Sequence, residues 1–324
     1  MKRLISLLLC ALLIVPALAE DAPDFEPIPW DIKVSPNLPN PDCYLPNNGG
    51  YHDDSIDIQI NVTYWTQDLQ QVDAPGEGTT TVMSARVKLT DVSQFRTGFA
   101  NKYPSKQSRH VNDMTKRFKA VMGIDGDYCL YHEQGIVVRN GQTLRMRPHK
   151  GRDELIVDEN GDFHLITCTT QAKWDEYIAG GGTVLHAFCF GPALVVDGVP
   201  LTSLDDVTID NGKAKKAQRM VIGQIGKLEY LILTNEGPES TAPKSVGFDL
   251  VQMANLCVQF GLDNAYNLDG GSSSTIALNN QKINSPSSHK NRMVGDCIWF
   301  ATLVKEETWR EKESVQTVEV EENK

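Results

Sequence analysis

The 324-residue sequence lacks the signatures of several large enzyme classes. It contains no Gly-x-Ser-x-Gly nucleophile elbow, no phosphate-binding loop ending in Gly-Lys-Ser or Gly-Lys-Thr, and no dinucleotide-binding fingerprint. These absences disfavour esterases, kinases and dehydrogenases. The seven histidines show no metal-ligand spacing such as His-Glu-x-x-His, and the cysteines show no paired spacing of a zinc site.

The sequence also has fewer positively charged residues than negatively charged ones. The chain carries 31 Lys and Arg residues against 42 Asp and Glu residues, a net charge of −11, with no basic stripe or aromatic ladder. We therefore expect no nucleic-acid partner. A phosphate-bearing substrate would have to be held by a few local arginines, helix ends or backbone amides in an enclosed site.

Long hydrophobic runs are absent after the N-terminus, where an apolar segment over residues 4–15 follows Lys2 and Arg3. This segment is shorter than the ~20 residues of a membrane-spanning helix. Together with the small-residue sequence Ala-Leu-Ala at 17–19, it predicts a signal peptide over residues 1–19. We expect a secreted, periplasmic or extracellular protein without stable membrane insertion.

Six cysteines follow the predicted signal peptide. An exported protein is in a compartment where disulfides can form, but a chain of this length can also bury a sufficient core without them. We expect one or two bridges with the other thiols buried. The spacing leaves the pairing open.

Composition divides the rest of the chain into three parts. Residues 20–53 are rich in proline and predict an extended N-terminal arm, and residues 305–324 predict a charged, flexible tail. Residues 54–304 contain no internal repeat and no linker, which predicts one domain of ordinary size.

Period-two alternation dominates this domain and predicts strands with one buried face. The clearest segments are 56–62, 81–89, 135–139, 154–157 and 162–166. Helices are predicted over 113–119 and 248–260, the second closed by Gly261, where a left-handed cap is expected. The predicted class is α+β: a β-rich single domain with a mixed sheet and a few packed helices.

The sharpest chemical signal follows the second predicted helix. A short strand over 264–268 leads into Asp269 and two glycines, whose freedom lets backbone amides approach a ligand closely. The turn can form an anion nest beside a carboxylate, and the alternative is an ordinary glycine-serine hairpin loop. The substrate-binding candidates here are Asn267, Gly270, Gly271, Ser272, Ser273, Ser274 and Thr275.

A second signal is the pair Asp125 and Asp127, which follows an apolar run and is separated by one glycine. Carboxylates at this spacing point to the same side of an extended chain. They can bind a divalent cation, or one can act in acid-base chemistry if burial raises its pKa. The alternative is a turn in which both aspartates bond to their own backbone.

Two arginines, Arg219 and Arg292, each open a predicted strand, over 219–224 and 292–300. An arginine at a strand end can donate two hydrogen bonds to a phosphate. The alternative is a solvated surface arginine, because charged residues mostly face water.

Taken in order, five segments resemble the phosphodiester glycosidase family. They are Asp125 to Tyr128, Gly191 to Val195, Arg219 to Gly223, Asn267 to Thr275, and the strand from Arg292. The likeness spans roughly residues 114–300. Two positions depart from the family pattern: Asp125 stands where asparagine is usual, and Ser272 stands where a third glycine is usual.

The resemblance implies hydrolysis of a carbohydrate phosphodiester substrate at the bond between the anomeric carbon and the phosphate oxygen. It implies that Asp269 is the base or nucleophile and that Asp127 orients water or assists protonation. Arg219 and Arg292 would clamp the phosphate, and Gly191, Gln224 and Asp125 join the substrate-binding candidates.

No cofactor is required for this chemistry, although a divalent cation at Asp125 and Asp127 is possible. Two alternatives stay open. One is a metal-dependent phosphodiesterase that cuts the P–O bond with Asp125, Asp127 and Asp269. The other is a noncatalytic module that binds polysaccharide, such as exopolysaccharide.

Overall fold

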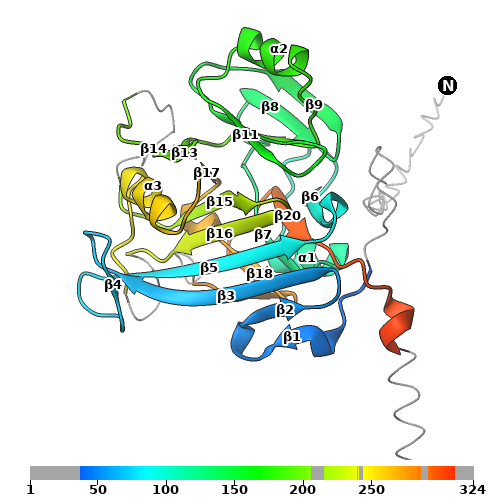
Figure 1. Cartoon of the computed structure of the whole chain (residues 1–324), viewed down its shortest axis with the longest axis vertical. Helices are drawn as coiled ribbons and strands as arrows, with labels where there is room; N and C mark the ends of the chain where they lie inside the picture. The colour runs from blue at the N-terminus through cyan, green and yellow to red at the C-terminus, as the bar shows by residue number, and fades with distance from the viewer. Residues whose placement is uncertain (1–36, 206–214, 239, 241–243, 286–290, 311–324) are drawn as a thin grey trace, which may run out of the picture.

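The computed structural model describes residues 37–205, 215–238, 240, 244–285 and 291–310 (Figure 1). The predicted signal peptide lies outside these ranges. The described chain forms three antiparallel sheets and the helices α1 (Val111–Phe118), α2 (Gln171–Ala179) and α3 (Leu250–Gln259). This is the predicted α+β class, but the described sheets are antiparallel where a mixed sheet was expected. No helix in the described ranges has the length and hydrophobicity needed to cross a membrane.

The largest sheet is built around the long neighbouring strands β3 and β5 (Figure 1). Their alternating sequences place one set of side chains in the core and leave the other partly exposed. In spatial order the strands are β1 (Tyr44–Leu45), β2 (Gly50–His52), β3 (Ile56–Trp65), β5 (Thr80–Leu89), β16 (Glu229–Asn235), β15 (Arg219–Gly226), β17 (Asn264–Asn267), β13 (Ala193–Val196) and β14 (Val199–Pro200), with β4 (Gln71–Val72) paired to β3.

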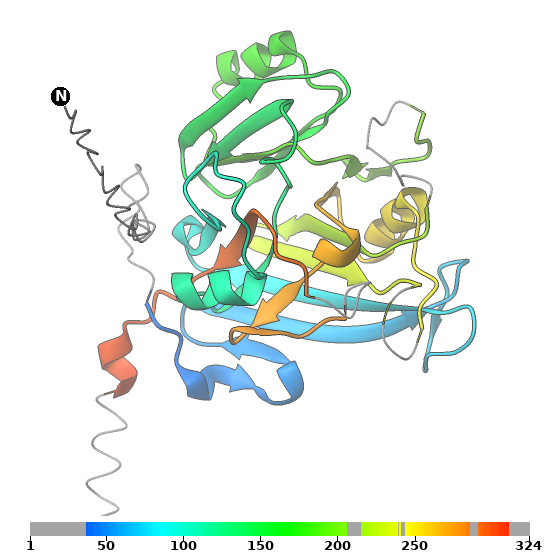
Figure 2. The ribbon, with the colours of Figure 1, turned by 180° about the vertical axis from the view of Figure 1, so that it is seen from behind.

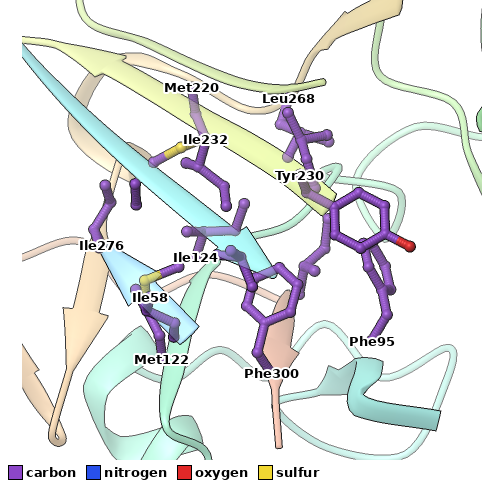
Figure 3. Packing of buried hydrophobic residues seen from close by; sticks show 14 of the residues in the cluster. Ile58, Phe95, Met122, Ile124, Met220, Tyr230, Ile232, Leu268, Ile276 and Phe300 are labelled. Atoms are coloured by element: carbon purple, nitrogen blue, oxygen red, sulfur yellow. The ribbon is translucent and has the colours of Figure 1, made fainter. Parts of the chain in front are cut away.

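A second sheet packs against one face of the largest sheet. Figure 3 shows Ile58 and Ile232 of the largest sheet close to Ile124, Ile276 and Phe300 of the second. Burying a large aliphatic or aromatic side chain contributes about 1.5–3 kcal/mol, so this shared core holds the two sheets together. The strands are, in order, β19 (Gln281–Lys282), β18 (Ile276–Leu278), β7 (Met122–Asp125), β20 (Asp296–Phe300) and β6 (Phe95–Phe99).

Helices cover the outer faces of these two sheets. The buried residues of α3 pack with Val221 and Leu233 on the far side of the largest sheet. Helix α1 covers the outer face of the second sheet (Figure 2). There Phe118 stacks on Trp299 with ring centroids 5.3 Å apart. The layers therefore run helix, sheet, sheet, helix.

A third sheet lies beside these layers and carries α2 (Figure 1). Trp174 of α2 packs with Ile136 and Ile156 from its strands. In spatial order the strands are β11 (Phe163–Ile166), β10 (Glu154–Val157), β12 (His186–Phe188), β8 (Gly135–Arg139) and β9 (Gln142–Arg147).

Most predicted elements are present with bounds shifted by a few residues. The strands predicted over 135–139 and 154–157 have the same ends in the structure. The two predicted helices correspond to α1 and α3, and Gly261 after α3 has a φ of +79°, which confirms the left-handed cap. Helix α2 was not predicted.

Three expectations differ from the structure. Residues 44–52 of the expected arm form β1 and β2 at the edge of the largest sheet. The strand expected from Arg292 begins only at Asp296, because residues before it form a loop in which Val294 bridges Arg109. In the expected tail, residues 306–310 are helical.

The cysteines also differ from expectation. All six cysteines among the described residues are free thiols, so the expected bridges are not formed. Four of them are buried, and Cys43 and Cys168 are the more accessible ones. The four thiols are buried in three hydrophobic clusters, and a chain of this length can hold its fold through such burial without disulfides.

Candidate active site

A pocket opens where three loops meet at one end of the second sheet. Strand β7 ends at Asp125, and the antiparallel strands β18 and β20 begin on either side of that end. The loop after β7, the turn before β18 and the loop before β20 are therefore brought together. The pocket has a volume of about 110 Å³ and is lined by Tyr128, Tyr131, Asp269, Ser273, Arg292, Met293 and Val294.

Asp269 reaches the pocket because backbone bonds fix the turn that carries it. The amide of Leu268 donates to the carbonyl of Met220, and the amide of Asp269 donates to the carbonyl of Gly126 at 3.2 Å. The left-handed conformation falls on Gly271, with a φ of +62°, which leaves its neighbour Ser272 without the steric cost of positive φ.

The amides of this turn are engaged within the protein. Gly270 donates to Oδ1 of Asp269 at 2.8 Å, and Gly271 donates to the carbonyl of Gln218 at 3.0 Å. The amide of Thr275 donates to Oδ1 of Asp125. The expected anion nest from the Gly270 and Gly271 amides is therefore not formed, and the positive charge at the pocket comes from Arg292.

The pKa of Asp269 is raised, chiefly because the surrounding protein displaces water from its charged form. Ser273, the Gly270 amide and the Arg292 guanidinium oppose this rise, whereas the charge of Asp127 adds to it. A carboxyl group with a raised pKa is a stronger base once ionised, which suits proton transfer near neutral pH.

A buried ion cluster lies behind the pocket. Nη2 of Arg139 is 3.1 Å from Oδ2 of Asp127 and 3.0 Å from Oδ2 of Asp296, and the amide of Cys189 donates to Oδ2 of Asp127 at 2.9 Å. Gly126 permits this packing, since a Cβ there would lie 2.5 Å from the Asp296 carboxyl carbon. Arg139 thus supplies the positive charge that two buried carboxylates require.

The two carboxyl groups of this cluster respond differently to burial. Burial acts to raise the pKa of Asp127, but the Arg139 charge and the Cys189 amide outweigh it, so the pKa is lowered. Burial and the neighbouring Asp127 raise the pKa of Asp296 to about 6, against the opposing charge of Arg139. Asp127 therefore ionises at lower pH than Asp296, and Asp296 is the member of the pair that takes up a proton first as pH falls.

Asp125 and Asp127 do not share a ligand, although their spacing predicted that they would point the same way. The chain leaves the strand at Asp125, so the two side chains contact different neighbours. Burial and the charge of Asp269 raise the pKa of Asp125 well above its usual range. Asp125 holds the start of β18 through its bond to Thr275.

Residues of the same cluster are the described candidates for binding a divalent cation. Among the described residues, one set of three candidate metal ligands lies close together: Asp127, Cys129 and Asp296. Arg139 already lies between the two carboxylates and would have to be displaced by a cation. Asp125 is not a member of this set. These residues do not fit a divalent cation, and no catalytic step is assigned to one.

The remaining candidates lie elsewhere. Arg219 is buried and donates to the carbonyls of Phe248 and Lys215. It is absent from the described pocket lining. Burial lowers its pKa to about 10. Gln224 links β15 to β11 through Asp162.

Other candidates support the site from behind. The side-chain amide of Asn267 donates to the carbonyl of Gly191 at 2.8 Å, which ties the end of β17 to the loop before β13. Ser274 and Thr275 are fully buried beside the pocket. Ser272 is half-buried in the turn.

Several residues at or behind the pocket were not predicted from the sequence, among them Tyr131, Arg139 and Asp296. Arg139 is the last residue of an otherwise apolar buried strand. A charged residue at the end of such a run is the feature of the sequence that could have indicated a buried charge. Asp296 belongs to the segment that resembles the family, but it was not among the predicted site residues.

Comparison with known proteins places these features in a family. No curated protein matches the chain. The catalytic domain of zebrafish N-acetylglucosamine-1-phosphodiester alpha-N-acetylglucosaminidase, auto-inhibited by its pro-peptide, is similar in fold, with a TM-score of 0.60, 14% identity, and coverage of 78% of this chain and 86% of that chain. A hypothetical protein from Synechocystis is similar with a TM-score of 0.51, 13% identity, and coverage of 77% and 62%.

At these identities the structural likeness shows the fold alone. The model of the phosphodiester glycosidase family matches residues 118–301, which is more than half of the chain and includes every residue that lines the pocket. The chain therefore belongs to the phosphodiester glycosidase family.

Proposed function

We propose that this protein is an exported hydrolase that cleaves a sugar-1-phosphate diester between the anomeric carbon and the phosphate oxygen. The observation that carries the proposal is the convergence of Asp269 and Arg292 on one pocket, from segments more than 20 residues apart in sequence. A carboxylate beside a guanidinium matches a substrate that is cationic at its sugar and anionic at its phosphate during cleavage.

Each group has a distinct task in this proposal. The guanidinium of Arg292 stabilises the negative charge that grows on the departing phosphate. The carboxylate of Asp269 acts at the anomeric carbon, as a base toward water or as a nucleophile. Asp127 lies behind the pocket, bound to Arg139, and acts on Asp269 through its charge.

The test is hydrolysis of a panel of sugar-1-phosphate diesters in water enriched in oxygen-18, with products resolved by mass. The name of the zebrafish protein makes an N-acetylglucosamine-1-phosphodiester the first substrate to try. The proposal requires label in the released sugar. Label in the phosphate would instead favour P–O cleavage, and binding without turnover across the panel would favour a noncatalytic module.

Export is tested separately. A signal peptide over residues 1–19 requires the mature protein to begin at Glu20. Mass spectrometry of protein recovered from outside the cytosol measures this directly. Recovery of the intact N-terminus from the cytosol alone would refute export and leave the chemistry untouched.

A further inference from the structure

Two tyrosines form one side of the pocket. The rings of Tyr128 and Tyr131 are stacked, with centroids 4.5 Å apart and an interplanar angle of 26°. A backbone bond from the Tyr131 amide to the Tyr128 carbonyl closes the turn between them. The Tyr131 hydroxyl donates to the carbonyl of Lys106 at 3.2 Å. The pair is therefore held in place before any ligand arrives.

Two exposed large hydrophobic residues lie on this side of the pocket. The side chain of Tyr131 is 37% exposed and that of Met293 is 53% exposed, and both line the pocket. Tyr128 is only half-buried beneath its partner. Exposed apolar side chains gathered at a pocket that also holds charged groups are typical of a binding site.

The pocket is too small to enclose a whole glycosyl phosphodiester. Its volume of about 110 Å³ is well below the about 300–1,000 Å³ of pockets that enclose drug-sized ligands. Arg292 and Asp269 supply its polar groups, which suit the phosphate and the anomeric centre. A sugar ring attached to that centre therefore has to extend out of the pocket, and the tyrosine pair forms one side of it.

We propose that the Tyr128–Tyr131 pair is the sugar subsite, and that a pyranose ring packs its C–H face on the exposed ring of Tyr131. This inference rests on the proposed function and adds the substrate class to it. The negative face of an aromatic ring attracts the weakly positive hydrogens of such a C–H face. Rings of the gluco type, whose equatorial hydroxyls leave that face apolar, fit better than rings with an axial hydroxyl on it.

The experiment measures binding as well as turnover, in the full-length mature protein. Saturation-transfer NMR with glucose 1-phosphate gives the affinity for a sugar phosphate, and competition of inorganic phosphate against that signal gives the affinity for the anion alone. Tyr131→Ala and Tyr131→Leu remove the ring, and the second keeps apolar volume in case the first fails to fold. We expect each to weaken glucose 1-phosphate binding by about 10-fold and phosphate binding by less than about 2-fold.

Two further variants sharpen the comparison. Tyr131→Phe keeps the ring and removes only the bond to Lys106, so its loss should be smaller than that of Tyr131→Leu. Met146→Ala removes a comparably exposed apolar side chain on β9, outside the described pocket lining, and should leave sugar binding unchanged. Equal sugar affinity in wild type and Tyr131→Leu would overturn the subsite.

Failure of the subsite and failure of the proposed function give different results. Turnover with a KM that does not depend on Tyr131 would overturn the subsite and leave the enzyme in place. Sugar binding that depends on Tyr131, without turnover of any diester, would support the subsite and overturn the hydrolase. Absence of any sugar-phosphate binding by the wild type would overturn both.

Discussion

Asp269 is the residue on which the proposed chemistry depends most. Asp269→Asn nearly preserves the shape of the side chain and removes its charge. We expect turnover of a sugar-1-phosphate diester to fall at least ~100-fold, comparable to the loss of a central electrostatic group in other enzymes. Asp263→Asn, which changes an exposed carboxylate just before β17, is the matched control and should retain full kcat. Unchanged kinetics in Asp269→Asn would refute the assigned role.

Arg292 should control the pH at which Asp269 ionises. Its positive charge lowers the pKa of Asp269, so Arg292→Gln allows that pKa to rise further. Activity that needs the carboxylate is lost as pH falls through this pKa, and the acid limb of the kcat/KM profile should therefore move to higher pH. The maximum should also fall by about 10–100-fold as the phosphate contact is lost.

The control for this prediction keeps the charge. Arg292→Lys retains a positive group near Asp269 but not the forked guanidinium, so the acid limb should move less than in Arg292→Gln. An acid limb that stays in place in Arg292→Gln would show that Asp269 is not the group that titrates.

Arg139 carries a large share of the local stability because two buried carboxylates depend on it. Arg139→Met keeps much of the volume and leaves Asp127 and Asp296 without a counter-charge. We expect the free energy of unfolding to fall by about 3–5 kcal/mol, measured by urea denaturation. Arg86→Met breaks an exposed ion pair with Glu229 and should cost no more than about 1 kcal/mol. Similar losses in the two variants would contradict the view that burial decides the cost.

At the scale of elements, local pattern predicted strands well and their assembly poorly. The strands over 135–139 and 154–157 could be placed because β-branched residues are features of the segment itself, but the expectation of one buried face was wrong for both, since every residue in them is buried. Helix α2 was not predicted because Trp174 is its only buried residue. Its sequence therefore has no apolar stripe at helical spacing.

The candidate site was predictable only in part. The segments that carry Asp269 and Arg292 have recognisable composition, but their meeting depends on β18 and β20 flanking β7, which no local pattern encodes. The pair of Arg139 and Asp296 was missed for a different reason. A charged residue in a sequence is usually exposed, and a buried partner cannot be identified without coordinates.

The start of α3 offers a test of one element. Asp249 caps this helix, accepting from the amide of Gln252 at 2.8 Å while the Gln252 side chain accepts from the Asp249 amide at 3.2 Å. Asp249→Ala should lower the free energy of unfolding by about 1 kcal/mol, measured by chemical denaturation. Asp249→Asn keeps an acceptor and should cost less. A neutral Asp249→Ala would show that the packing of α3 alone fixes its start.

At the scale of the whole molecule, raised carboxyl pKa values predict how stability depends on pH. Burial raises the pKa of Asp296 to about 6 and that of Glu236 to about 7, from ordinary values of 3.8 and 4.5. Between the ordinary pKa and the raised pKa of each group, the folded state binds more protons than the unfolded state. The free energy of unfolding therefore falls as pH rises through that range. Asp127, with its lowered pKa, acts in the opposite direction below about pH 4.

The melting temperature should therefore be highest near pH 4 and should decline as pH rises toward 7. Differential scanning calorimetry across this range measures it. Glu236→Gln removes one of the contributing groups and should flatten the decline between pH 5 and pH 7. A melting temperature that rises steadily to pH 8 would contradict the assignment of these buried acids.

The hydrogen bond from the Asp269 amide to the carbonyl of Gly126 joins the turn that bears the carboxylate to the loop that continues into Tyr128. We expect a displacement of one loop to move the other through that bond. Selectivity for a ligand and speed of reaction are consequently linked in this architecture. Directed evolution toward a new sugar should alter turnover at the same time, and compensating changes should accumulate around residue 126.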